Sequence, residues 1–261
     1  LKERGIIPTL AIVRCGANPS DLSYEKGATK RAELVGVAVK KYELPEDVTK
    51  EALMATIDEI NGDDSVHGVL MFRPLPKHLK ADQDEICNRL DPKKDVDCMT
   101  DLSNAGVFEG RKDLGYAPCT PEACMEILDY YGIDCKGKSA VVIGRSLVVG
   151  QPAALLLQRR NATVTVCHTG TRDIPALCRD ADIVIAAAGR PGLITADCLR
   201  LGQTVLDVGV HPGPDGTLCG DVAPEAAGLD LALTPVPGGV GSVTSAVLCK
   251  HTIQAAENTR L

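Results

Sequence analysis

The stretch "VVIGRSLVVGQP", residues 141–152, decides the fold class of this chain. An apolar β-branched run leads into a glycine turn and then into residues that favour a helix. In this arrangement backbone N–H groups and the helix dipole can hold a pyrophosphate. Aligned to the dinucleotide pattern G-x-G-x-x-G, the stretch supplies Gly144, Ser146 and Val149, with Gly150 one position late. It predicts a dinucleotide site, and an ordinary strand-to-helix turn is the alternative.

On both sides of this stretch, short β-rich runs alternate with segments whose apolar residues have helical spacing, almost throughout the chain. This alternation is typical of an α/β protein with largely parallel sheets. The expected strands are residues 9–13, 35–44, 66–72, 139–144, 162–167, 181–189 and 204–209. The expected helices are residues 20–36, 48–62, 121–132, 146–160 and 243–259.

The length of 261 residues favours two domains. A passage that reads as loop, residues 102–121, separates two α/β blocks. We therefore expect a first domain over 1–118 and a second over 119–243. The final helix, 244–261, is expected to pack back on the first domain and complete it.

Composition narrows the class of partner. The formal net charge of -7 disfavours binding to nucleic acid or a membrane surface, which would need a basic excess. The eleven Cys include no CxxC pair that would suggest a zinc site, and they are typical of reduced thiols in a cytoplasmic protein. No apolar window is long enough to predict a membrane span. The chain opens on Leu1, so we expect that some N-terminal sequence precedes it.

The strand after the glycine turn indicates which dinucleotide is bound. NAD sites usually end this strand in an acidic residue that binds the ribose hydroxyls, but here Cys167, His168 and Thr169 follow. Together with Arg145 and Arg172, Thr169 offers cationic and hydroxyl partners for a 2′-phosphate. The sequence predicts NADP. The alternative is that both arginines are solvated surface cations.

Several motifs, taken in order along the chain, resemble the bifunctional methylenetetrahydrofolate dehydrogenase/cyclohydrolase family. The resemblance implies a folate-binding first domain, a Rossmann-like second domain that binds NADP, and a homodimer. The motifs are "PLP" (74–76), "KDVD" (94–97), "PCTP" (118–121), "GRSLVVGQP" (144–152), "GDV" (220–222) and "TPVPGGVGSVT" (234–244).

The same resemblance implies roles for individual residues. Tyr24 is expected to be the active-site tyrosine and Asp97 the carboxylate that holds the pterin end of the folate, so both are candidate catalytic and substrate-binding residues. Without the resemblance, Asp97 would be interpreted as a solvated loop acid and Tyr24 as a half-buried helix residue. The loop after residue 236 is expected to lie beside substrate and nicotinamide; its candidate residues are Pro237, Gly238 and Gly239 for the substrate and Gly241 for the cofactor.

Two positions depart from the family pattern. The family carries a lysine four residues after the tyrosine, on the same helix face, and this chain carries Ala28. Lys26 and Lys30 lie roughly 200° round the helix from that position. The family glutamine that hydrogen-bonds this lysine is replaced by Phe72. Taken alone, Phe72 would be an ordinary aromatic at the end of a strand.

Losing the lysine and the glutamine together leaves neither partner orphaned in a buried site. Hydride transfer from methylenetetrahydrofolate to NADP requires positioning more than a base, whereas hydrolysis of the methenyl product requires acid and base groups. The sequence therefore predicts an NADP-dependent dehydrogenase whose cyclohydrolase activity is weak or lost. The alternatives are a bifunctional enzyme that uses a substitute residue and an inactive paralogue that binds folate or dinucleotide.

Overall fold

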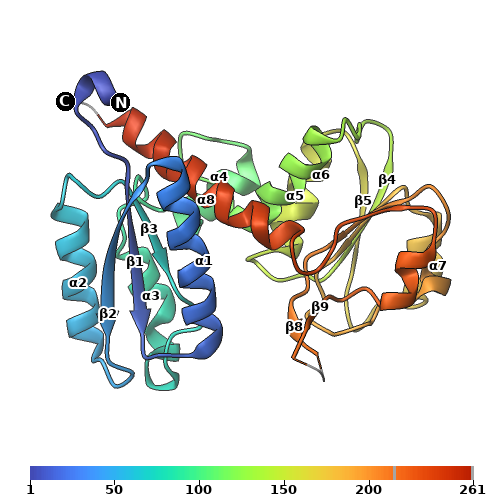
Figure 1. Ribbon diagram of the computed structural model, residues 1–261, viewed down its shortest axis with the longest axis horizontal. Coiled ribbons are helices and arrows are strands. Elements are labelled where there is room, and N and C mark those ends of the chain that lie inside the picture. Colours follow the sequence, from blue (N-terminus) through green and yellow to red (C-terminus); the bar gives the residue numbers. More distant parts are fainter. Residues whose placement is uncertain (214–215, 260–261) are drawn as a thin grey trace. The chain divides into compact units, whose positions relative to one another are not determined.

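A computed structural model describes residues 1–213 and 216–259 of the chain (Figure 1). The chain forms two compact units. The first comprises Leu1–Cys119 and Ser245–Leu261, and the second comprises Thr120–Thr244. Each unit has its own parallel β-sheet, which confirms the predicted two-domain α/β fold class.

The first unit is built on a three-stranded parallel sheet in the order β2-β1-β3. Alternation along β1 sends Ala11 and Val13 to one face, where they pack in an apolar core with Leu53 and Ile57 of α2. The strands are β1 (Thr9–Cys15), β2 (Ala38–Leu44) and β3 (Gly68–Met71). The helices are α1 (Pro19–Val35), α2 (Lys50–Gly62), α3 (Gln83–Asn88) and α4 (Asp101–Glu109), with short 3₁₀ turns at Lys2–Arg4 and Lys77–Asp82.

Helix α1 has a defined start and end. The Asn18 side chain accepts a hydrogen bond from the Ser20 backbone N–H at 2.9 Å, and Pro19 occupies the first turn. Gly36 ends the helix in the left-handed conformation, with φ of 75°. With these bounds Tyr24 lies in the second turn of the helix and Ala28 one turn further on.

The passage 102–121 was expected to be loop, and the structure corrects this, because α4 covers its first half. Thr100 caps α4 by accepting the Ser103 backbone N–H at 3.2 Å, and Gly110 ends the helix at φ of 77°. Small and polar residues dominate α4, so its sequence shows little helical periodicity. The capping residues Thr100 and Gly110 could have predicted this helix from the sequence.

The second unit contains a five-stranded parallel sheet in the order β10-β7-β6-β4-β5. The strand order reverses at β4, which pairs with β5 on one side and β6 on the other. Ligands in such sheets bind beyond the carboxyl ends of the strands at this switch point. The strands are β4 (Ser139–Ile143), β5 (Thr163–Cys167), β6 (Ile183–Ala186), β7 (Thr204–Asp207) and β10 (Ala232–Leu233), with a β8 (His211–Pro212) and β9 (Leu218–Cys219) hairpin.

Helices α5 (Cys119–Tyr130), α6 (Gly150–Arg159), α7 (Ile174–Asp180) and the start of α8 (Val240–Asn258) also belong to the second unit, with 3₁₀ turns at Ala196–Cys198 and Pro224–Gly228. Most of α8 groups with the first unit. Across the described residues, no helix combines the length and apolar character needed to cross a membrane.

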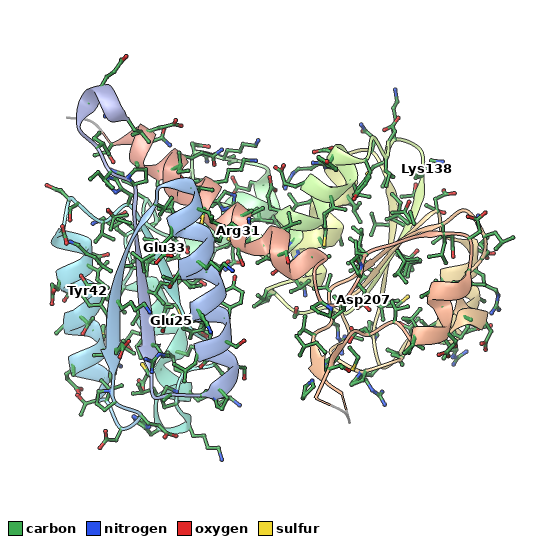
Figure 2. All side chains as sticks on the ribbon, in the orientation of Figure 1. Glu25, Arg31, Glu33, Tyr42, Lys138 and Asp207 are labelled. Atoms are coloured by element: carbon green, nitrogen blue, oxygen red, sulfur yellow. The ribbon has the colours of Figure 1, made fainter. Side chains whose placement is uncertain are left out.

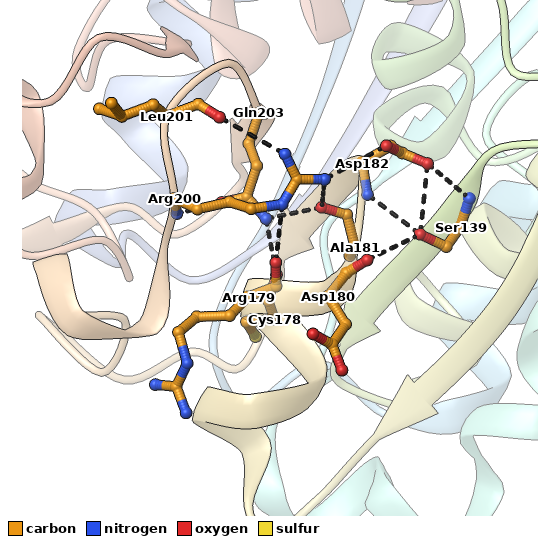
Figure 3. Close-up of polar contacts among 9 residues, drawn as sticks. All are labelled: Ser139, Cys178, Arg179, Asp180, Ala181, Asp182, Arg200, Leu201 and Gln203. Carbon is orange, nitrogen blue, oxygen red and sulfur yellow. Dashed lines mark hydrogen bonds and ion pairs between the residues drawn. The ribbon is translucent and has the colours of Figure 1, made fainter.

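The end of α7 is held by side chains from a distant segment (Figure 3). The Gln203 side-chain amide donates to the carbonyl oxygens of Cys178 and Ala181 at 2.7 and 2.6 Å. Arg200 Nε donates to the carbonyl oxygen of Arg179 at 2.8 Å. Helix C-termini leave carbonyl groups without intrahelical partners, and these donors satisfy them. The contact fixes α7 against the start of β7.

Candidate active site

A cavity of about 400 Å³ lies at the carboxyl ends of β4, β5 and β6 in the second unit. Its position beside the switch point and its size suit a cofactor. The lining includes four of the predicted cofactor residues and not Val149, Gly150 or Gly241. The lining residues are Ile143, Gly144, Arg145, Ser146, His168, Thr169, Ile174, Ala187, Ala188, Arg190 and Leu193.

Two glycines shape the turn that borders this cavity. Gly144 has φ of 129°, and a Cβ added there would lie 2.2 Å from the carbonyl oxygen of Ala187. A Cβ on Gly150 would lie 2.1 Å from the carbonyl oxygen of Gly144. Both distances are far below van der Waals contact, so any larger residue at either position has to displace backbone. The dense packing explains why glycine occurs at both places.

Helix α6 was expected to begin at Ser146, and the structure places its start at Gly150. The Ser146 hydroxyl accepts hydrogen bonds from the backbone N–H groups of Val149 and Gly150, at 3.1 and 3.4 Å. A serine that bonds the backbone three and four residues on favours a turn over a helix. The turn leaves Arg145 exposed at the mouth of the cavity.

Polar groups from two further strand ends line the cavity. Thr169 follows β5 and is exposed, and Arg190 follows β6 and is exposed. The Nδ1 atom of His168 accepts the Gly170 backbone N–H at 3.0 Å. The neutral imidazole therefore carries its proton on Nε2, where it is a donor. His168 and Arg190 were not among the predicted site residues, whereas the predicted Arg172 does not line the cavity.

The "GDV" motif fixes one wall of the cavity. The fully buried Asp221 carboxylate accepts the backbone N–H groups of Ala188, Gly189 and Arg190, at 2.6, 2.9 and 2.8 Å. The Nε2 atom of His211 lies 2.7 Å from Asp221 Oδ1. Sequence reasoning gave the motif no role, because these partners lie about ten to thirty residues away.

Asp207, labelled in Figure 2, supports the segment that carries Asp221. Its buried carboxylate accepts the backbone N–H groups of Asp221 and Val222 at 2.9 and 3.0 Å. Burial raises the pKa of Asp207, and these hydrogen bonds oppose the rise. The two carboxylates therefore act by accepting backbone hydrogen bonds that shape the cavity.

The predicted substrate loop precedes α8. Pro237 and Gly238 are exposed, and Gly238 has φ of 99°. Gly239 is buried, and a Cβ there would lie 2.3 Å from the carbonyl oxygen of Pro235. Helix α8 begins at Val240, three residues before its expected start, so Gly241 lies in the first turn and is exposed.

The structure brings Tyr24 of α1 and Phe72 of the first unit together. Their ring centroids lie 5.9 Å apart with the ring planes at 90°, an edge-to-face contact. The Phe72 backbone N–H donates to the carbonyl oxygen of Val13 at 3.0 Å, which continues the β1–β3 ladder. Both side chains are half-buried. Phe72 is therefore part of a defined contact with the candidate active-site tyrosine.

The helix face that carries Tyr24 presents no lysine at the next turn. Ala28 is 1% exposed, whereas Lys26 and Lys30 are exposed. A longer side chain at residue 28 would have to displace packed neighbours.

Asp97 lies in the same group of residues. Its Oδ1 accepts the Cys119 backbone N–H at 3.2 Å. Burial raises the pKa of the Asp97 carboxyl, and the hydrogen bonds from Cys119 and the positive charge of Arg73 oppose the rise. Burial and the charge of Asp97 raise the pKa of Tyr24 well above its ordinary value. Tyr24 is therefore protonated at neutral pH and can donate a hydrogen bond. Arg73 was not among the predicted site residues.

Two family models match the chain. Residues 1–97 match the catalytic domain of tetrahydrofolate dehydrogenase/cyclohydrolase, and residues 118–260 match its NAD(P)-binding domain. The chain belongs to the tetrahydrofolate dehydrogenase/cyclohydrolase family. The resemblance predicted from the sequence is confirmed, and so is a dinucleotide cofactor of the NAD(P) type.

Individual members of the tetrahydrofolate dehydrogenase/cyclohydrolase family are similar over nearly the whole chain. The bifunctional protein FolD of Carboxydothermus hydrogenoformans is 50% identical over 260 residues, which cover 98% of this chain and 90% of that protein. The structure of the bifunctional FolD methylenetetrahydrofolate dehydrogenase/cyclohydrolase from Campylobacter jejuni is 39% identical with a TM-score of 0.92, covering 98% and 90%. The Trypanosoma brucei FolD structure, complexed with NADP cofactor and inhibitor, is 35% identical with a TM-score of 0.91, covering 98% and 89%.

Proposed function

We propose that this protein is an NADP-dependent methylenetetrahydrofolate dehydrogenase whose cyclohydrolase activity is weak or lost. One observation carries the proposal: the glycine turn and its cavity are intact, while Ala28 and Phe72 occupy the positions where the family has a lysine and its glutamine partner. The family relatives named above are bifunctional, so the proposed difference lies in the hydrolytic step.

The residues of the second unit fit NADP. The turn from Gly144 to Gly150 and the N-terminus of α6 suit the pyrophosphate. Arg145, the Thr169 hydroxyl and the Nε2–H of His168 are donors for a 2′-phosphate at the cavity lining. No carboxylate directly follows β5, where an NAD site usually has one. The donors present therefore favour the phosphorylated dinucleotide.

Bound NADP supplies the hydride acceptor for oxidation of the methylene carbon. The chain then has to hold the folate at the correct distance and angle. Tyr24 offers an O–H donor and is held by its edge-to-face contact with Phe72, and Asp97 offers a carboxylate for the pterin amino groups. Positioning of this kind can contribute about 7 to 11 kcal/mol to lowering a barrier. Pro237, Gly238 and Gly239 are proposed to lie beside the substrate.

Hydrolysis of the methenyl cation makes a further demand, because water has to be activated and a ring nitrogen later protonated. Tyr24 keeps its proton at neutral pH, so it is a poor base. Ala28 and Phe72 have no titratable group. The candidate site therefore supports hydride transfer better than hydrolysis.

A single assay tests the proposal. Purified protein is given methylenetetrahydrofolate and NADP, and both the reduced cofactor and the methenyl product are followed by absorbance. We expect reduced cofactor and methenyl product to appear in equal amounts. Methenyl that is consumed as fast as it forms would show a bifunctional enzyme with a substitute residue, and no turnover would show an inactive paralogue.

Cofactor choice gives a prediction at Arg145. Arg145→Ala should raise KM for NADP about tenfold and leave KM for NAD within about twofold, because the guanidinium would bond only the 2′-phosphate. Lys136→Ala, which removes an exposed cation of the same unit, is the control and should change neither constant. A wild-type preference for NAD at equal concentrations would contradict the assignment.

Folate recognition gives a prediction at Asp97. Asp97→Ala should raise KM for methylenetetrahydrofolate at least tenfold while KM for NADP stays within about twofold, as expected for a carboxylate that contacts one substrate. Asp113→Ala, at an exposed loop acid paired with Arg111, is the matched control. If both constants rose equally in Asp97→Ala, Asp97 would have a structural role instead.

The resemblance also implies a homodimer, and the cysteine pattern favours the cytoplasm; both stay predictions. Light scattering of the purified protein would measure its mass in solution, and fractionation of the source cells would locate it.

A further inference from the structure

A buried ion pair includes Glu25, the residue that follows Tyr24 in α1. Arg14 of β1 is 7% exposed and Glu25 of α1 is 5% exposed, and Arg14 Nε lies 3.0 Å from Glu25 Oε2 (Figure 2 labels Glu25). The second Glu25 oxygen pairs with Lys41 Nζ of β2 at 2.7 Å. Arg14 also donates to the carbonyl oxygen of Gly16 and pairs with Glu43 at 3.3 Å. Both buried charges are thus well supplied with partners.

The charge of Glu25 is maintained at neutral pH. Burial by itself would raise the pKa of Glu25, but hydrogen bonds from Lys41 and Arg14 and their positive charges hold it below its ordinary value of 4.5. Because the folded-state pKa is lowered, the pair contributes stability above pH 4.5 and loses it as the pH falls through the folded value. Glu25 is therefore ionised at neutral pH.

The pair joins α1, which carries Tyr24, to β1, the strand that pairs with β3 just before Phe72. Glu25 directly follows Tyr24 on α1. Arg14 directly follows Val13, whose carbonyl oxygen accepts the Phe72 backbone N–H. The ion pair and the ring contact therefore both connect α1 to the paired strands β1 and β3, through neighbouring residues on each side.

Glu25 is the charged residue among the buried side chains of α1, and its ion-pair partners lie on the sheet. The buried residues of this 17-residue helix are Glu25, Ala28 and Ala32. Burial of small apolar side chains such as Ala28 and Ala32 is a non-directional contribution that does not by itself select one register. A hydrogen-bonded ion pair has one favourable geometry, and buried polar pairs are best attested as devices that fix register. The Arg14–Glu25 pair is therefore suited to fix the register of α1 against β1.

We propose that Arg14 and Glu25 are positioning residues for Tyr24, setting the register of α1 so that the Tyr24 ring meets Phe72 edge to face. A buried ion pair contributes little net stability over an apolar pair of similar volume, because desolvation opposes the Coulomb attraction. The pair acts instead on geometry, to which hydride transfer is sensitive: a misplacement of about 1 Å can lower a rate by about 10². The catalytic consequence rests on the proposed function, whereas the ring geometry does not.

The chain offers a spectroscopic test of the ring geometry. It contains two Phe: Phe72 in the contact, and Phe108, which is 75% exposed. Full-length protein labelled with ring-¹³C phenylalanine should give two sets of ring signals, which Phe108→Leu assigns. In Glu25→Gln and in Arg14→Met we expect the Phe72 signals to shift and their cross-peaks to the Tyr24 ring to weaken. The Phe108 signals should stay unchanged.

Kinetics provide the second readout. Glu25→Gln should lower kcat for methylenetetrahydrofolate oxidation about tenfold and leave KM for NADP within twofold. In a Tyr24→Ala background the same change should cause no further loss, since residues that act through one another are not additive. Asp58→Asn breaks an exposed ion pair with Arg89 at 2.6 Å in the same unit, and as the matched control it should change neither the spectrum of Phe72 nor the rate.

Two outcomes would overturn the proposal. One is an unchanged Phe72 spectrum in a folded Glu25→Gln protein whose melting temperature has fallen, which would give the pair a purely structural role. If the single variants do not fold, Arg14→Leu with Glu25→Leu removes both charges together; an unchanged ring contact and full activity in that protein would also overturn it. A wild-type protein without turnover would refute the proposed function and leave the test of the ring contact intact.

Discussion

Methenyltetrahydrofolate should accumulate when the purified protein oxidises methylenetetrahydrofolate, and its hydrolysis should run little faster than in buffer. Acid and base catalysis is typically worth about 10² to 10⁴ in rate, and this is the contribution that we expect to be missing. The reason lies at two positions. Ala28 is buried at the place of the family lysine, and Phe72 is in contact with Tyr24 at the place of its glutamine partner.

Restoring the lysine alone should not restore hydrolysis. In Ala28→Lys the new side chain enters a buried position one turn from Tyr24, and the glutamine partner of the family lysine is missing. Its pKa falls or the fold loses stability, and overpacking adds roughly 1 to 3 kcal/mol of strain. Phe72→Gln alone leaves an amide without its lysine.

The double variant Ala28→Lys with Phe72→Gln restores both partners and should recover hydrolysis where each single variant fails. Decay of the methenyl absorbance, measured for all four proteins under one set of conditions, gives the rates, and thermal melts show whether each variant is folded. Residues that act as a unit show this kind of non-additivity. A wild-type protein that hydrolyses methenyltetrahydrofolate as fast as it forms it would refute the idea.

Gly150→Ala should abolish cofactor binding, with at least a hundredfold loss of affinity for NADP. The added Cβ would lie 2.1 Å from the carbonyl oxygen of Gly144 and 2.8 Å from the backbone nitrogen of Arg145. Both atoms belong to the turn that borders the cavity, and Gly144 is itself packed against the backbone of Ala187. The clash can be relieved only by moving the turn, which displaces Arg145 and Ser146 from the cavity.

Isothermal titration with NADP measures the loss at Gly150. Gly27→Ala is the control, because a Cβ at this helical position meets no atom within 4 Å. It should bind NADP normally and gain about 0.4 to 1 kcal/mol of stability from the lower entropy of the unfolded chain. Binding by Gly150→Ala within threefold of the wild type would show that the turn adapts and is not rigid.

The parts of this structure that depend on local pattern could be predicted from the sequence. The run before Gly144 and the alternation of strands and helices indicated two α/β domains, and the strand after the turn indicated the cofactor class. The start of α6 was wrong by four residues, because the Ser146 hydroxyl competes for the backbone N–H groups that would otherwise begin the helix. In α4 the apolar pattern was too weak to predict a helix, and the start of the helix is marked by the Thr100 cap instead.

The features that could not be predicted depend on partners far apart in the chain. A glutamate on a helix is expected to be solvated, and Glu25 is buried because Arg14 and Lys41 reach it from two different strands. The place of Arg190 at the cavity depends on Asp221, which binds its backbone from 31 residues away. The edge-to-face contact of Tyr24 with Phe72 depends on the register between α1 and β3. A local sequence pattern does not specify which of these distant residues meet in the fold.

The wall that Asp221 holds has a thermodynamic consequence for cofactor binding. Three consecutive backbone N–H groups, from Ala188 to Arg190, are already bonded to one buried carboxylate, and the Gly144 backbone is packed against Ala187. A binding loop that is ordered in advance loses little conformational entropy when the ligand arrives, so more of the contact energy is expressed as affinity. The affinity for the cofactor therefore depends in part on Asp221, through the backbone that its carboxylate holds in place.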